Sequence, residues 1–232
     1  MVLLAACGGG KVDDVEPLEP QPYGESEETN IQLWLETMEL SSRELFAARE
    51  NVVAALRLQP GQRVADIGAG TGLYTLMFAP IVGDEGVVYA VDIEPRFLRL
   101  INQRVDDLDM TNVVSVLSHP KDITLPSGSV DAVYIADTYH YLDDPEAVMA
   151  TVRDALVDGG RLFMVEFNRG APGVDSQNKD HVRFGKAELV AELETMGFAL
   201  VEEPKVDGLK DYYMAVFEKV SLAEVSAEQS TD

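Results

Sequence analysis

The sequence predicts an α/β domain with a doubly wound, Rossmann-like sheet of seven strands that ends in an antiparallel hairpin. Short apolar runs alternate with longer segments of helical periodicity between residues 63 and 196. This alternation is typical of a parallel sheet with helices on both faces. A glycine-rich turn follows the first apolar run, at 68–72. The last two apolar runs are joined by a connection too short for a parallel crossover, so we expect them to pair antiparallel.

The elements follow from local signals, taken in chain order. Residues 31–58 predict two helical segments, the second beginning with a capping box of Ser41 as N-cap and Glu44 at N3. Strands are expected at 63–67, 86–91, 113–117, 130–136, 161–167, 198–203 and 212–220, where short apolar runs occur. Helices are expected at 73–81, 95–108, 145–157 and 186–196; the second starts at Pro95, the third stops at Asp158-Gly159-Gly160, and the fourth stops at Gly197.

The domain organisation follows from length and composition. The chain has 232 residues, 46% of them hydrophobic, which suits one domain with a full core and modest tails. We expect this domain at residues 31–220. Residues 8–30 are rich in Gly, Pro, Glu and Asp and predict a disordered acidic linker, and residues 221–232 predict an acidic tail.

The first seven residues resemble the end of a bacterial lipoprotein signal. Leu4, two alanines and then Cys7 match a lipobox, in which the cysteine is lipidated, although the segment before it is short and lacks Lys or Arg. We therefore expect residues 1–7 to be a truncated signal with lipobox, and Cys7 to anchor a lipoprotein to a bacterial membrane facing the periplasm. A frayed N-terminus on a cytoplasmic protein is the alternative.

Charge and cysteine content exclude several classes of function. The net charge is −23, from 41 acidic and 18 basic residues, so we expect no nucleic-acid partner. Cys7 is the one cysteine in the sequence, which excludes an internal disulfide and a cysteine-based metal cluster. The three histidines are scattered without the short spacing of a zinc site, so we expect no metal. Nothing in the sequence indicates an oligomeric state.

The turn in "VADIGAGTG" predicts a ligand site. Gly68, Gly70 and Gly72, with Ala69 and Thr71 between them, let the backbone adopt positive φ and approach a ligand. The dinucleotide fingerprint would need glycine at 73, where the chain has leucine. Asp66 also stands where a pyrophosphate would lie, and two anions repel. We therefore expect a ligand with a cationic group at Asp66, which disfavours NAD.

Two further acidic residues follow strands at the same edge of the predicted sheet. Asp92 ends the second strand, where its carboxylate can accept both hydroxyls of a ribose, and Ile93 can pack on a purine face. Asp122 can accept an exocyclic amino hydrogen, and Ile123 can cover the ring edge. The alternatives are that Asp92 caps the next helix and that Asp122 is a turn residue.

Polar and aromatic residues crowd the end of the fourth strand, in "IADTYHYLDD". Ligand chemistry in doubly wound sheets occurs at the carboxyl ends of the strands. A histidine side chain can accept a proton near neutrality, which makes His140 a candidate base, and Asp137 and Tyr139 are the other candidates. The alternative is that His140 is a hydrogen-bonded core residue.

Taken together, these motifs resemble the class I S-adenosylmethionine-dependent methyltransferases, over about residues 52–219. "VADIGAGTG" and "VYAVDIEP" resemble the first two motifs, "DITLPSGSVDAVYIADTYHYLDD" the segment of the adenine-binding acidic residue and fourth strand, and "ALVDGGRLFMVEF" the fifth-strand motif. The chain is similar in particular to the small-molecule branch that includes ubiquinone/menaquinone-type methyltransferases.

The resemblance implies S-adenosylmethionine as the cofactor and assigns roles to the residues above. Asp66 and the turn Gly68–Gly72 would face its methionine part, Asp92 would hold the ribose, and Asp122 with Ile123 would hold the adenine. Asp137 and His140 would line the methyl-donor side.

The acceptor is expected to be a small-molecule or lipid-like compound. The chain lacks the Asn/Asp-Pro-Pro-Tyr/Phe motif of amino methylation, and Cys7 precedes the fold, which disfavours cysteine-dependent base methylation. Residues 31–56 and 168–183 would recognise the acceptor, but neither carries a motif that identifies it. A lipid-anchored, non-catalytic nucleoside-binding protein is the alternative function, and an NAD-dependent oxidoreductase is a weaker one.

Overall fold

The computed structural model describes residues 31–40, 43–170, 182 and 184–220. These residues belong to a unit that begins at Ile31. The lipobox with Cys7, the acidic linker 8–30, Ser41, most of the segment 171–183 and the tail 221–232 lie outside the described residues. No helix among the described residues combines the length and the hydropathy that a membrane span requires.

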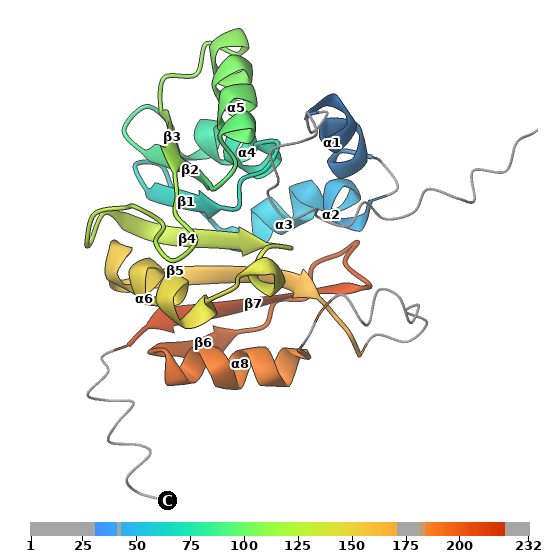
Figure 1. The fold of residues 1–232 in the computed structure, drawn as a ribbon, viewed down its shortest axis with the longest axis vertical. Coiled ribbons are helices and arrows are strands. Elements are labelled where there is room, and N and C mark those ends of the chain that lie inside the picture. The colour runs from blue at the N-terminus through green and yellow to red at the C-terminus, as the bar shows by residue number, and fades with distance from the viewer. Residues whose placement is uncertain (1–30, 41–42, 171–181, 183, 221–232) are drawn as a thin grey trace, which may run out of the picture. The chain divides into compact units, whose positions relative to one another are not determined.

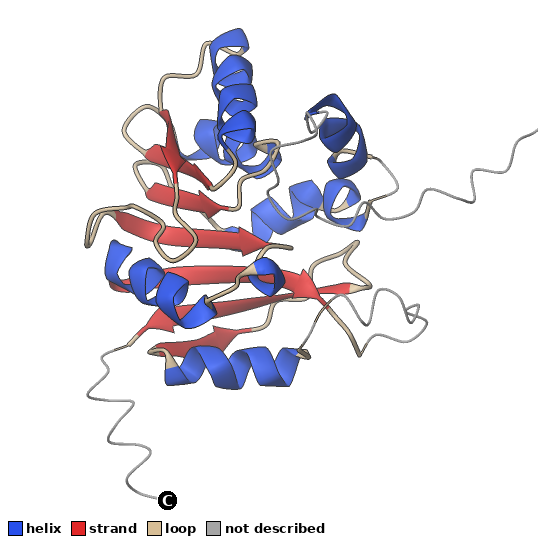
Figure 2. Ribbon diagram, in the orientation of Figure 1, coloured by secondary structure: helices blue, strands red, loops and turns tan. Residues whose placement is uncertain are grey.

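A seven-stranded mixed sheet forms the centre of this unit, in the order β3-β2-β1-β4-β5-β7-β6 (Figures 1 and 2). β1 to β5 run parallel, and β7 lies antiparallel between β5 and β6. This confirms the predicted fold class and the antiparallel pairing of the last two strands. The strands are β1 (Arg63–Ile67), β2 (Val87–Asp92), β3 (Val113–Leu117), β4 (Val130–Ala136), β5 (Leu156–Phe167), β6 (Phe198–Glu202) and β7 (Tyr212–Lys219).

Helices cover both faces of the sheet because neighbouring strand residues point to opposite sides. In β4, Ala132 and Tyr134 pack in the cluster with α3 and α4, whereas Val133 and Ile135 pack in the cluster with α6 and α8. A smaller cluster joins α5 to Ala90 of β2. The helices are α1 (Ile31–Met38), α2 (Glu44–Ala47), α3 (Arg49–Leu56), α4 (Leu73–Val82), α5 (Pro95–Asp107), η1 (Tyr139–Tyr141), α6 (Pro145–Ala155) and α8 (Lys186–Thr195).

Two local predictions differ from the structure. Residues 31–58 form three short helices rather than two, and Glu44 is the first residue of α2 instead of its third. The Glu44 carboxylate accepts the backbone N–H groups of residues 210–212, which lead into β7, so it ties the N-terminal helices to the sheet. α6 ends at Ala155, two residues early, because Leu156 is buried and pairs with Val130 as the start of β5.

Candidate functional site

The glycine turn connects β1 to α4 at the carboxyl edge of the parallel strands. Gly68, Gly70 and Gly72 all have positive φ, at 70°, 54° and 81°. A Cβ on Gly68 would clash with the side chain of Thr138, and one on Gly72 would lie 2.7 Å from Cγ1 of Ile101. These two glycines are therefore required by the turn's own packing, and the methionine side chain of Met38 lies beside Gly70.

Asp92 ends β2 beside this turn. Its Oδ2 accepts the N–H of Gly70 at 2.8 Å, and its Oδ1 accepts the N–H of Glu94 at 2.8 Å. Burial raises the pKa of Asp92, and the two backbone N–H groups oppose that rise. A carboxylate has about four lone-pair sites, so each oxygen keeps room for a second donor such as a ribose hydroxyl.

Asp66 of β1 is buried below the turn, with 3% of its surface exposed. Its Oδ2 accepts the hydroxyl of Thr75 at 2.6 Å. The pKa of Asp66 is raised to about 7. Burial is the largest cause and the charge of Asp92 adds to it, whereas the hydrogen bonds from Thr75 act in the opposite direction. A cationic group on a ligand would stabilise the ionised form of this carboxyl, as the sequence predicted, whereas a pyrophosphate would destabilise it.

The residues expected around a nucleoside ring lie in two different environments. Ile93 is half-buried and Asp122 is exposed, with its Oδ1 accepting the N–H of Thr124 at 2.7 Å. Ile123 is 1% exposed and packs in the core with α6. The side chain of Ile123 therefore lies inside the protein, which argues against its covering the edge of an adenine ring.

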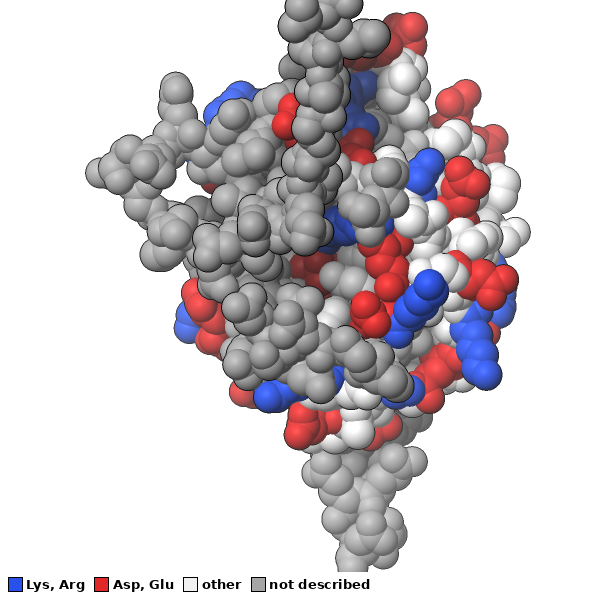
Figure 3. Space-filling view, turned by 90° about the vertical axis from the view of Figure 1, so that its right-hand side faces the viewer, with Lys and Arg blue, Asp and Glu red and all other residues white. Residues whose placement is uncertain are grey.

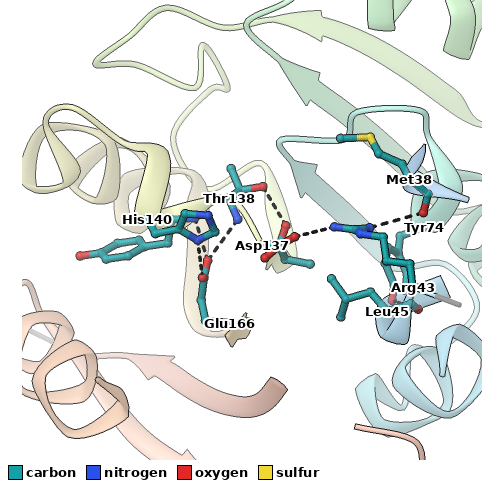
Figure 4. Close-up of polar contacts among 10 residues, drawn as sticks. Met38, Arg43, Leu45, Tyr74, Asp137, Thr138, His140 and Glu166 are labelled. Carbon is teal, nitrogen blue, oxygen red and sulfur yellow. Dashed lines mark hydrogen bonds and ion pairs between the residues drawn. The ribbon is translucent and has the colours of Figure 1, made fainter. Parts of the chain in front are cut away.

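Asp137 follows β4 directly and has a positive φ of 51°, a conformation that few residues other than glycine adopt. Its carboxylate accepts Arg43 at 2.5 Å, and burial together with the charge of Asp137 raises the pKa of the Tyr212 phenol. Figure 4 shows the Arg43 and Asp137 side chains pointing toward each other, with His140 and Glu166 on the other side of Asp137. Asp137 is thus held between a helical segment and β7.

His140 is buried in η1, and its Nδ1 lies 2.8 Å from Oε2 of Glu166. Both side chains are almost completely inaccessible to solvent, at 1% and 0% exposure. The other carboxylate oxygen of Glu166 accepts the N–H groups of Thr138 and Tyr139. His140 is therefore a buried, hydrogen-bonded residue, as one interpretation of the sequence expected. It also lies beside Asp137 at the end of β4, where the other interpretation placed it.

Tyr139 lies in a different place from the other candidate bases. It is fully buried in the core cluster with α6 and α8, where its ring packs edge-on against Phe184 at 5.4 Å between ring centres. A phenol packed in the core does not reach an acceptor at the edge of the sheet. This position argues against Tyr139 as a base. The side chain of His140 is likewise buried, whereas 19% of the Asp137 side chain is exposed, so Asp137 is the candidate base that solvent reaches.

Sequence reasoning missed Arg43, Tyr212 and Glu166. Glu166 carries the same signal that identified Asp92, a charged residue at the carboxyl end of a buried run, "RLFMVEF". Arg43 and Tyr212 carry no such signal, because they are brought to Asp137 from segments far away in the sequence.

Asp137, His140 and Glu166 could also be taken for a metal site, since ligand atoms of the three lie within 4.8 Å of one another. Their carboxylates already accept Arg43 and backbone N–H groups, which favours a hydrogen-bond network instead.

The residues of this edge fit S-adenosylmethionine better than a dinucleotide. The buried Asp66 suits a cationic group and would repel a pyrophosphate, and Asp92 suits hydroxyl donors. Figure 3 looks onto this edge, and on its visible described surface Asp and Glu side chains lie among Lys and Arg side chains.

Comparison with known proteins supports the same family. Residues 65–164 match the family model described as a methyltransferase domain. A "Ubiquinone/menaquinone biosynthesis C-methyltransferase UbiE" of Teredinibacter turnerae is 34% identical over 113 residues, which are 48% of this chain and 45% of that protein. The protein of the same name from Vibrio campbellii is 32% identical over 112 residues, which are 48% of this chain and 43% of that protein. The chain thus spans less than half the length of these curated relatives.

Two solved structures show the shared fold. The solved structure of a "SAM dependent methyltransferase from Aquifex aeolicus" superposes with a TM-score of 0.72 at 23% identity, and the match covers 82% of this chain and 99% of that one. The "[4+2]-Cyclase SpnF" superposes with a TM-score of 0.63 at 16% identity, covering 75% and 82%. The second protein is named for a different reaction, so the fold alone does not determine the chemistry. Residues 65–164 are thus similar to a methyltransferase domain, and the chain shares the fold of a solved S-adenosylmethionine-dependent methyltransferase.

Proposed function

We propose that the protein transfers a methyl group from S-adenosylmethionine to a small-molecule or lipid-like acceptor. The observation that carries the proposal is the pair of buried carboxylates beside the glycine turn. Asp66 is placed for the cationic methionine part of the cofactor and Asp92 for its ribose hydroxyls. Asp122 is the proposed partner of the adenine amino group, since its carboxylate is exposed at the end of the neighbouring loop.

The protein's share in such a reaction is mainly alignment. When bound, the cofactor supplies a methyl group on a positively charged sulfur, which is a good leaving group. Holding an acceptor in line with that methyl group can supply about 7–11 kcal/mol of the barrier. Asp137, whose side chain is partly exposed and lies beside the buried His140, is the residue we propose to receive a proton where the acceptor must lose one.

The acceptor class is proposed from the relatives and from the charge of the chain. The UbiE proteins are named as ubiquinone/menaquinone biosynthesis C-methyltransferases, and they match this chain over their shared domain. A net charge of −23 disfavours a polyanionic acceptor. We therefore propose an uncharged, ring-containing acceptor of the quinol kind, methylated on carbon.

Methyl transfer is tested directly by incubating the protein with S-adenosylmethionine carrying a tritiated methyl group and a bacterial small-molecule and lipid extract. We expect label in an organic-soluble product. The Asp92→Ala variant is expected to lose this labelling, whereas Asp106→Ala, an exposed aspartate on α5, is expected to keep it. Cofactor binding without any labelled product would favour the non-catalytic binding protein.

We further propose that Cys7 carries a lipid that holds the domain at a membrane. The proposal rests on the lipobox-like run from Leu4 to Cys7. Growth of an expressing bacterium with labelled palmitate is expected to label the wild type and not Cys7→Ser. An unlabelled wild-type protein would contradict it and favour the cytoplasmic alternative.

A further inference from the structure

Glu166 is a buried carboxylate at the end of β5, and the proposed function assigns it no role. It has 0% of its surface exposed. Oε1 accepts the N–H of Thr138 at 3.1 Å and that of Tyr139 at 2.8 Å, and Oε2 lies 2.8 Å from Nδ1 of His140. Figure 4 shows Glu166 directly below His140, turned toward the chain that follows β4.

These contacts select one tautomer of His140. An ionised carboxylate only accepts hydrogen bonds, so the imidazole atom that faces it must be a donor. Nδ1 therefore carries a proton. In the neutral ring the other nitrogen, Nε2, is then the one with the lone pair that can receive a proton.

The same carboxylate holds the turn that presents Asp137. Asp137 has positive φ, and its N–H donates to the carbonyl of Val165, the residue before Glu166. The next two N–H groups along the chain, those of Thr138 and Tyr139, both donate to Glu166. Three consecutive residues of the turn are thus tied to the end of β5, which offsets the cost of the unusual backbone conformation.

We propose that Glu166 is a positioning residue that fixes His140 as the Nδ1–H tautomer and fixes the turn carrying Asp137. The turn held in this way presents the Asp137 carboxylate, whose side chain is 19% exposed, at the edge of the sheet. This use of the turn rests on the proposed methyl transfer.

The Glu166→Gln variant separates the tautomer from the fold. The Gln carbonyl keeps an acceptor for the N–H groups of Thr138 and Tyr139, but its amide group then faces Nδ1 of His140 as a donor. Nδ1 must become the acceptor, so the proton is expected to move to Nε2. Nitrogen-15 NMR of the imidazoles reports which ring nitrogen carries the proton, in the full chain and without cofactor.

The chain offers good controls for this experiment. It has three histidines, and His140→Gln identifies the signals of His140 by their loss. Glu218→Gln makes the same chemical change on β7, which pairs with β5, at a carboxylate bound to Arg161 near the surface. We expect Glu218→Gln to leave the His140 signals unchanged. A wild-type spectrum with the proton on Nε2 would overturn the proposal, and this reading stands even if Glu166→Gln does not fold.

Calorimetric titration with S-adenosylmethionine keeps the two proposals apart. Glu166→Gln is expected to bind within about threefold of the wild type, since the tautomer bears on the proton and not on the cofactor. An unchanged tautomer in Glu166→Gln, or a loss of affinity of about tenfold or more, would overturn the positioning role. A wild type that shows the Nδ1–H tautomer but does not bind the cofactor would instead contradict the proposed function.

Discussion

At the scale of single residues, the buried carboxyl of Asp66 couples the site to pH. Burial raises its pKa to about 7 in the folded protein, from an ordinary value of 3.8. Between these values the folded protein keeps a proton that the unfolded chain has lost. The free energy of unfolding therefore contains a contribution from Asp66 that is fully present below about pH 4 and is lost as pH rises toward about 7.

Asp66→Asn tests this coupling, because asparagine has a similar shape and can still accept the Thr75 hydroxyl. We expect the free energy of unfolding of the variant, relative to the wild type, to increase between pH 4 and pH 7, with a slope that approaches about 1.4 kcal/mol per pH unit. Above about pH 7.5 the difference should level off. Urea unfolding over this pH range is the measurement, and parallel pH profiles for the two proteins would contradict the raised pKa.

Some residues of the site could be identified from the sequence and others could not. Asp66 and Asp92 were identified because the ends of neighbouring parallel strands meet at one edge, a consequence of topology. Burial was not readable in the same way, so Tyr139 and Ile123 were assigned to a ligand although their side chains pack in the core. Arg43 reaches Asp137 across 94 positions of sequence, a contact that only the folded chain creates.

At the scale of elements, the turn between β1 and α4 needs its glycines for packing as well as for backbone conformation. Gly68→Ala is expected to destabilise the protein, because it adds both positive-φ strain, about 1–2 kcal/mol, and a clash with Thr138. Gly128 also has positive φ but faces open space. Gly128→Ala therefore measures the strain alone. Urea unfolding of both variants should show the larger loss for Gly68→Ala, and equal losses would contradict the clash.

The attachment of α2 to the sheet depends on Glu44. Its carboxylate accepts backbone N–H groups that precede β7, at 2.6–3.1 Å. We expect Glu44→Ala to lower the free energy of unfolding by about 1–3 kcal/mol, because it leaves these donors without their acceptor. Glu50→Ala, at an exposed glutamate on α3, should change it by less than about 0.5 kcal/mol. Thermal unfolding compares the two, and equal effects would contradict the attachment.

Element boundaries were predictable where a local signal decides them and not where packing does. Pro95 begins α5 as expected, with Glu94 capping the helix by accepting the N–H of Arg96. The glycines at 159 and 160 indicated a break between a helix ending at 157 and a strand starting at 161, but pairing with Val130 and burial of Leu156 extend β5 through them. The capping box was wrong for Glu44 because its carboxylate binds a distant segment in place of its own helix.

At the scale of the whole molecule, the excess of negative charge opposes folding. The net charge of −23 brings like charges closer together in the folded state than in the unfolded chain. Salt screens this repulsion, since the Debye length falls from about 30 Å at 0.01 M to about 8 Å at 0.15 M. We expect the thermal midpoint to rise with sodium chloride over this range. A midpoint that falls would show that the ion pairs outweigh the repulsion.

The parallel strands and the antiparallel end of the sheet could be predicted, because alternating apolar runs and short connections leave few alternatives. The insertion of β7 between β5 and β6 could not be read from the sequence, since both orders of a hairpin bury the same residues. The superposition with a cyclase shows that this architecture does not determine the reaction. Function therefore depends on which ligand the carboxylates at the sheet edge bind.

The most direct test of the central claim is a calorimetric titration of the protein with S-adenosylmethionine, S-adenosylhomocysteine and NAD. Asp66 and Asp92 predict binding of both adenosyl compounds, and Asp66 disfavours NAD because its charge would repel the pyrophosphate. The Asp92→Ala variant should bind them at least about tenfold more weakly, because hydrogen bonds to a charged group are worth about 1.5–3 kcal/mol each. Preferential binding of NAD, or adenosyl binding that Asp92→Ala leaves unchanged, would contradict the assignment of this edge as the cofactor site.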